Sequence, residues 1–197
     1  MREIDKILDR DEKVLWEGTP VFWPFFVGNS ILLTVFGFFW MMFMLVFIVS
    51  MGLIVLLFPH FWVGILLLVG PSLYHFLVYK HTYYALTSRR VLIQKGVIGR
   101  DFQIIDFDQI TNAEVNVGVF DQFFGKNTGT VLISTPTSFV TSKGGQRANP
   151  YRLCNIVNPY EVFKFFKKVS YDVKTDIEFP NQYRPAENPG YKTEYKS

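Results

Sequence analysis

Residues 18–79 read GTPVFWPFFVGNSILLTVFGFFWMMFMLVFIVSMGLIVLLFPHFWVGILLLVGPSLYHFLVY, and none of these residues is Asp, Glu, Lys or Arg. The hydrocarbon core of a bilayer is about 30 Å thick, and a helix needs roughly 20 apolar residues to cross it. The uncharged run is long enough for two such helices and a connection. Buried helices of soluble proteins are shorter and are interrupted by polar residues, so the run predicts an integral membrane protein.

Aromatic residues and prolines divide this run into two helices. Trp23 and Pro24 mark the entrance to the membrane, where Trp is suited to the headgroup layer. We expect the first helix at about 26–49 and the second at about 59–79, within a hairpin that occupies residues 21–80. The sequence does not decide which helix contains residues 53–58. Residues 1–20 are expected to form an N-terminal segment on the cytoplasmic side.

Positive charges near the membrane set the expected orientation, because cytoplasmic flanks are rich in Lys and Arg. The connection between the two helices has none. The flank after the second helix carries Lys80, Arg89, Arg90, Lys95 and Arg100. We therefore expect a two-pass protein of the cell membrane with both termini in the cytoplasm, and the single Cys154 agrees with a reducing compartment.

From His81 onward the hydrophobic period changes to about two, which is typical of strands. We expect strands at 81–87, 91–95, 102–107, 113–119, 130–135 and 151–157. A helix follows, with Asn158 as its N-cap and Pro159 at its first position. Its apolar face consists of Val162, Phe165, Phe166 and Val169. An antiparallel β-sandwich or barrel of about seven strands, capped by a C-terminal helix, is the outline of an α+β pleckstrin-homology-like (PH-like) domain over residues 81–171.

Several short motifs carry a resemblance to a known family. They are YALTSRRV (84–91), GVIGR (96–100), IDFDQI (105–110), GTVLI (129–133) and IVNPYEV (156–162), together with DEKVLW (11–16) and the two spans. Over about residues 8–170 the chain resembles the prokaryotic membrane-flanked PH-domain family, the second type of bacterial PH-like domain. The resemblance implies a membrane-tethered β-sandwich module whose ligand is mostly unassigned. The loop at about 136–149 is longer than this family leads us to expect, and the tail after Tyr171 is extra.

The tail, residues 172–197, is polar and contains Pro180, Pro185 and Pro189. Such a composition is typical of a disordered end, but the tail is also more aromatic than a solvating segment. Docking of an extended tail on its own domain or on a neighbour is the interpretation that we favour.

The sequence carries little catalytic chemistry. The three histidines, His60, His75 and His81, have no zinc-site spacing, and one cysteine cannot complete such a site. No phosphate-binding glycine motif or nucleophile elbow occurs. Asp106 and Asp108 could face the same way on a strand, but such pairs are common on solvated edges. We therefore expect no enzyme activity, no metal and no cofactor.

Charge provides the remaining indication of function. Residues 80–171 contain twelve Lys and Arg against six Asp and Glu. Basic residues beside a membrane attract anionic lipid, which makes Arg89, Arg90 and Arg100 candidate contacts for lipid headgroups. The alternative is that these arginines only mark topology and are solvated. No nucleic-acid-reading motif accompanies the positive charge, so nucleic acid is not an expected partner.

Three functions remain open from the sequence. The first is a membrane-anchored PH-like scaffold or adaptor that binds a protein partner or itself, with strand addition as a contact mode. The second is sensing of anionic lipid headgroups by the basic domain. The third is a pore, which two spans per chain could line only in an oligomer.

Overall fold

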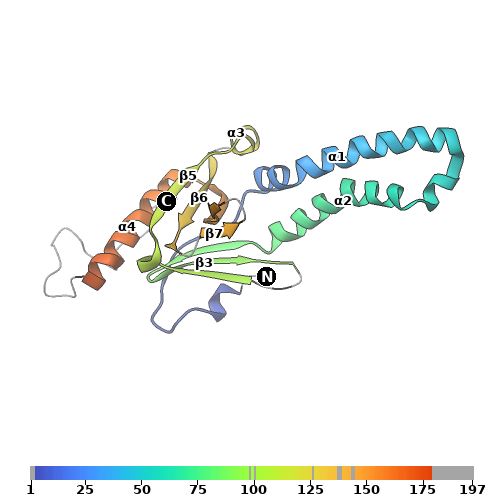
Figure 1. Cartoon of the computed structure of the whole chain (residues 1–197). Helices are drawn as coiled ribbons and strands as arrows, with labels where there is room; N and C mark the ends of the chain where they lie inside the picture. Colours follow the sequence, from blue (N-terminus) through green and yellow to red (C-terminus); the bar gives the residue numbers. More distant parts are fainter. Residues whose placement is uncertain are drawn as a thin grey trace.

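The computed structural model describes residues 3–97, 99, 101–125, 127–136, 139–142 and 145–178. Two long apolar helices form a hairpin that projects from a domain of β-sheets and helices (Figure 1). The first, α1, spans Phe22–Met51 and the second, α2, spans Pro59–Lys80. Both are long and apolar enough to span a membrane, as their sequences predict.

The connection between the helices is a 3₁₀ helix, η2 (Gly52–Leu57). Gly52 ends α1 with a φ of 70°, a left-handed conformation that glycine adopts without the steric cost of a Cβ. Residues 53–57, which the sequence could not assign to either helix, therefore belong to η2. The α1 helix also begins earlier than expected, at Phe22 rather than at about residue 26.

Small residues let α1 and α2 approach closely. A Cβ at Gly37 would lie only 2.5 Å from the backbone nitrogen of Leu68. The hydroxyls of Thr34 and Ser72 pair across the helices at 3.1 Å. Such small-residue contacts and hydroxyl pairs are characteristic of helix association in lipid. The outward side chains are apolar and open to their surroundings, as Leu32 is at 81% exposure, which suits a lipid environment.

Each of the two long helices is connected to a strand by only two or three residues. β1 (Val14–Gly18) precedes α1, β2 (Tyr83–Thr87) follows α2, and the two strands pair antiparallel. β3 (Arg90–Lys95) and β4 (Asp101–Asp106) extend this sheet in the order β1-β2-β3-β4. The sequence did not predict β1, which lies inside the expected N-terminal segment 1–20. The direct connections fix the orientation of the sheet relative to the hairpin.

A second antiparallel sheet contains β5 (Asn112–Asn116), β6 (Thr128–Ser134) and β9 (Tyr151–Val157). β5 ends at Asn116 rather than at the expected residue 119, because Val119 begins the short helix α3 (Val119–Phe124). Between β6 and β9, the stretch expected to be a long loop contains a hairpin of β7 (Phe139–Ser142) and β8 (Gly145–Ala148).

One buried cluster joins both sheets to α4 (Pro159–Glu178). The apolar face expected for this helix is confirmed, since Val162, Phe165, Phe166 and Val169 are all buried in the cluster. Pro159 is the first residue of α4, also as expected. The helix continues beyond Tyr171 to Glu178, so the first residues of the expected tail are helical. The remainder of that tail, residues 179–197, lies outside the described residues.

Two further short 3₁₀ helices are η1 (Ile4–Lys6) and η3 (Phe107–Gln109). Ile4 is buried against Ala85 and Leu92 on the face of the first sheet that points away from the main core. Leu8 packs against the same small cluster. The N-terminal segment therefore covers one face of the sheet before it enters β1.

Candidate functional site

In the part of the domain that the structure describes, polar side chains concentrate at two places. Within the described residues, no three His, Cys, Asp or Glu side chains lie close enough together to hold a metal ion. The first place is the turn between β2 and β3. The second is a pocket beside the beginning of α1.

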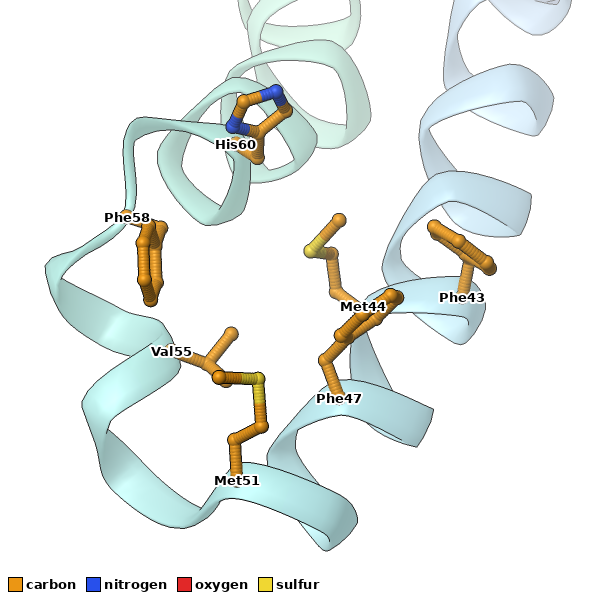
Figure 2. Close-up of a pocket in the computed structure, with 7 residues that line it drawn as sticks. All are labelled: Phe43, Met44, Phe47, Met51, Val55, Phe58 and His60. Carbon is orange, nitrogen blue, oxygen red and sulfur yellow. The ribbon is translucent and has the colours of Figure 1, made fainter.

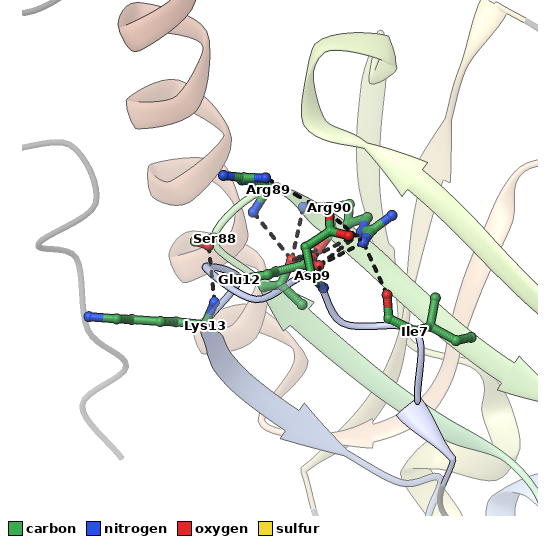
Figure 3. A network of polar contacts seen from close by, with 8 residues as sticks. Ile7, Asp9, Glu12, Lys13, Ser88, Arg89 and Arg90 are labelled. Atoms are coloured by element: carbon green, nitrogen blue, oxygen red, sulfur yellow. Dashed lines mark hydrogen bonds and ion pairs between the residues drawn. The ribbon is translucent and has the colours of Figure 1, made fainter. Parts of the chain in front are cut away.

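An ion-pair network at the β2–β3 turn ties the N-terminal segment to the sheet (Figure 3). The Glu12 side chain is fully buried, and its Oε2 lies 2.7 Å from Nη2 of Arg90. Nε of Arg90 donates to Glu12 Oε1 at 3.0 Å, so the pair is bidentate. Thr87 donates its hydroxyl proton to the same Oε1 at 2.6 Å, and Asp9 adds an ion pair to Arg90 at 3.1 Å.

The network changes the protonation of both partners. Burial of the Glu12 carboxyl acts to raise its pKa, but hydrogen bonds from Arg90, Thr87 and the backbone of Asp9, together with the charge of Arg90, lower the pKa from 4.5 to about 2. The hydrogen bond to Glu12 raises the pKa of Arg90. Both groups are therefore charged at neutral pH, and each neutralises the other.

Two of the three arginines expected to contact lipid headgroups lie in or beside this network. Arg90 is engaged by Glu12 and Asp9, and its side chain is only 16% exposed. Arg89 is more open, at 52%, and lies 3.8 Å from Asp9. Arg100 lies outside the described residues. The β2–β3 turn lies at the end of β2 that is farther from α2 (Figure 1). Contact of Arg89, Arg90 and Arg100 with lipid headgroups stays a prediction.

The second place is a pocket of about 260 Å³ between α1, α3 and the outer face of the second sheet. Its walls contain Pro24, Gly28 and Asn29 from α1, Phe120 and Asp121 from α3, and Asn116, Thr130, Leu132, Arg152, Cys154 and Asn155 from the strands or their ends. The strand residues alternate with core residues such as Val131 and Leu153, so they point away from the core. Sequence analysis did not single out any of these side chains as functional.

Asp121 organises the inner wall of this pocket. It is 4% exposed, and its carboxylate accepts hydrogen bonds from the backbone nitrogen of Gly118, the hydroxyl of Thr128 and the amide of Asn155, at 3.0, 2.9 and 2.8 Å. These three donors satisfy a buried charge that would otherwise be costly. They also fasten α3 to β6 and β9, and thereby keep the pocket open beside α1.

Cys154 contributes a thiol to the pocket and packs near the core. Burial raises the pKa of this thiol, and the positive charges of Lys95 and Arg152 act in the opposite direction without cancelling the effect. Its backbone nitrogen donates to the hydroxyl of buried Tyr84 at 3.0 Å, which links the two sheets. The thiol is therefore protonated and unreactive at neutral pH.

A further pocket, of about 300 Å³, lies within the hairpin (Figure 2), at the end of the hairpin farthest from the sheets (Figure 1). Apart from His60, its lining residues are apolar: Phe43, Met44, Phe47, Met51, Val55 and Phe58. The His60 backbone oxygen accepts a hydrogen bond from the Trp40 indole at 3.0 Å. The lining contains no Asp, Glu, Lys or Arg, so this space suits hydrocarbon.

Comparisons with known proteins identify the family to which the chain belongs. No curated protein matches the chain, and neither does any solved structure. One family model, described as "Bacterial PH domain", matches residues 30–160, which is more than half of the chain. The match runs from within α1, through strands β2 to β9, to the start of α4, and β1 lies before it. The chain therefore belongs to the bacterial PH domain family, as its sequence motifs indicate.

Proposed function

We propose that this protein is a membrane-anchored PH-like adaptor without catalytic activity, which binds an extended segment of a partner protein at the cytoplasmic face. The observation that carries the proposal is the edge of β4. Within the described residues this strand has a partner on one side only, β3, so its other side offers backbone groups for strand addition.

The placement of β4 suits an adaptor. The hairpin continues directly into β1 and β2, so the sheet has a fixed orientation relative to the membrane, and β4 is the strand farthest from β1. Asp101 and Asp106 lie at the two ends of β4 and are exposed, while Ile104 between them is 41% exposed. An extended segment with an apolar centre and basic residues at its ends would complement this edge.

The proposal is tested by photo-crosslinking in native membranes. A photoreactive side chain replaces Gln103, an exposed residue of β4, in the full-length protein, and a matched control replaces Lys164, an exposed residue of α4. We expect a crosslinked product at 103 and none at 164, with the partner peptide identified by mass spectrometry. A product of twice the mass would identify a second copy of the chain. Equal crosslinking at both positions, or none at either, refutes the adaptor proposal.

An oligomeric pore finds less support in the hairpin. Residues 18–79 carry no Asp, Glu, Lys or Arg, and the hydroxyls of Thr34 and Ser72 satisfy each other. A water-filled pore normally needs polar groups that face its lumen. The pore therefore stays a prediction, and conductance of the purified protein in planar bilayers would be its direct test.

A further inference from the structure

The pocket beside α1 lies at the level where the hairpin leaves the membrane. The ring of Phe22 contacts that of Tyr79 at 5.0 Å between centroids, and Tyr79 directly precedes Lys80, the last residue of α2. The first turn of α1 is therefore level with the last turn of α2, where the charge of Lys80 requires water or headgroups. Gly28, one turn further along α1, forms part of the pocket wall.

The short helix α3 lies against this same turn of α1. A Cβ at Gly28 would meet the Phe120 ring at 3.5 Å, and a Cβ at Gly125 would meet Pro24 at 2.8 Å. The side of α3 that faces away is apolar and uncovered: Val119, Phe123 and Phe124 are 64%, 79% and 51% exposed. Apolar side chains beside a spanning helix, at the level where it leaves the membrane, extend its lipid-facing surface.

The pocket between α1 and α3 is polar and has an unpaired cation. The Arg152 side chain is exposed in the pocket wall and forms no ion pair or side-chain hydrogen bond with any described residue. The Asp121 carboxylate nearby is already occupied by three donors. Thr130 accepts a hydrogen bond from the Asn155 backbone, which leaves its hydroxyl proton available, and the Asn116 amide is also free within the described structure.

We propose that this pocket binds the phosphate of an anionic phospholipid headgroup. Arg152 supplies the charge, Thr130 and Asn116 donate hydrogen bonds, and the exposed aromatic residues of α3 sit in the interfacial layer so that the pocket opens among the headgroups. An arginine with adjacent neutral donors is a common way to recognise a phosphate group. The site is distinct from the β4 edge and from Arg89, Arg90 and Arg100, so it can succeed or fail independently of the adaptor proposal.

Lipid retention tests the charge in this site. The full-length protein is reconstituted in nanodiscs of phosphatidylcholine with a minority of phosphatidylglycerol, released into mild detergent, and examined by native mass spectrometry. We expect wild type to retain phosphatidylglycerol, and Arg152→Gln to retain it about tenfold less or lower still, because a charge-assisted hydrogen bond to phosphate is lost. The control Lys168→Gln removes the same charge from the exposed face of α4 and should stay within about twofold of wild type. Equal retention by Arg152→Gln and Lys168→Gln would overturn the proposal.

Two further measurements separate a lipid from a free anion. Inorganic phosphate at millimolar concentration should not displace phosphatidylglycerol, and displacement would show that the pocket takes free phosphate instead. A spin label at Phe123→Cys, in a Cys154→Ser background, should be more accessible to oxygen than to a water-soluble nickel reagent. The same label at Lys168→Cys should show the reverse. If the label at position 123 behaves like the label at 168, α3 does not lie in the interface and the proposed lipid site is wrong.

Discussion

Replacement of Glu12 by Gln tests whether the buried ion pair holds the N-terminal segment on the sheet. Gln keeps the size of Glu12 and an oxygen that can accept from Thr87, but it removes the charge that faces Arg90. A pKa lowered from 4.5 to about 2 corresponds to about 3 kcal/mol of stabilisation at neutral pH, at 1.36 kcal/mol per pKa unit. Loss of one partner of a buried pair also leaves Arg90 incompletely neutralised, so the expected cost is about 3–5 kcal/mol.

The effect can be measured by amide hydrogen exchange on the full-length protein in nanodiscs. Exchange in β1 and β2 should accelerate in Glu12→Gln, because the segment that carries Ile4 and Leu8 no longer stays on the sheet. Asp108→Asn provides the control, since it also replaces a carboxylate by an amide of the same size, but at an exposed position in η3. The control should change stability by less than about 0.5 kcal/mol.

The same pair predicts a pH dependence. The folded-state pKa of Glu12 lies below its unfolded value, so its stabilisation is complete above about pH 4.5 and is lost as pH falls toward 2. Wild-type β1 should therefore open progressively over that range, whereas Glu12→Gln should already be open at neutral pH and change little. If Glu12→Gln matches wild type within about 1 kcal/mol and shows the same pH profile, the ion pair does not hold the segment.

Three other expectations follow from close contacts. Gly37→Leu should push α1 away from the Leu68 backbone. A disulfide between Thr34→Cys and Ser72→Cys should form readily in a protein that keeps Gly37 and poorly in the Gly37→Leu variant, as measured by gel mobility. An unchanged yield of the disulfide would contradict the close approach of the helices. Asp121→Ala should cost about 2–4 kcal/mol in thermal unfolding, because three hydrogen-bond donors lose their acceptor, whereas Asp108→Ala should cost little. The Cys154 thiol should react slowly with a maleimide at pH 7 and much faster above pH 9, since burial raises its pKa; rapid labelling at pH 7 would show that the second sheet opens.

Much of the architecture was predictable because its signals are local. The absence of charge over residues 18–79 predicts the hairpin, and a period of two followed by a helical period predicts strands followed by α4. The N-terminal strand β1 was not predictable in this way. It is only five residues long, and it is a strand because it pairs with β2 across the length of the hairpin, from Trp16 to Leu86. A pairing between residues so distant in sequence leaves little trace in either segment alone.

The candidate site was harder to predict for the same reason. In the sequence Asp121 looks like an ordinary acidic residue in a short, mostly apolar segment between two glycines, and its role depends on Thr128 and Asn155, which come from two different strands. One usable signal exists in β9, where Arg152 alternates with buried Leu153 and must therefore point away from the core. That alternation gives the direction of the side chain, but it does not reveal that α1 and α3 lie on the same side.

A residue close to the hairpin in sequence need not lie close to it in space, and Arg89 and Arg152 show the difference. Arg89 comes nine residues after the end of α2 at Lys80, yet β2 carries the chain away from the hairpin, and five residues of strand span about 17 Å. Arg152 is far from α2 in sequence, but β9 returns beside the start of α1, where the Val21 nitrogen donates to the Asn155 oxygen at 2.8 Å. A basic residue on β9, which returns to the hairpin, should therefore contribute more to lipid binding than one beyond β2, which leads away from it. Replacement of Arg152 should accordingly weaken lipid binding more than replacement of Arg89.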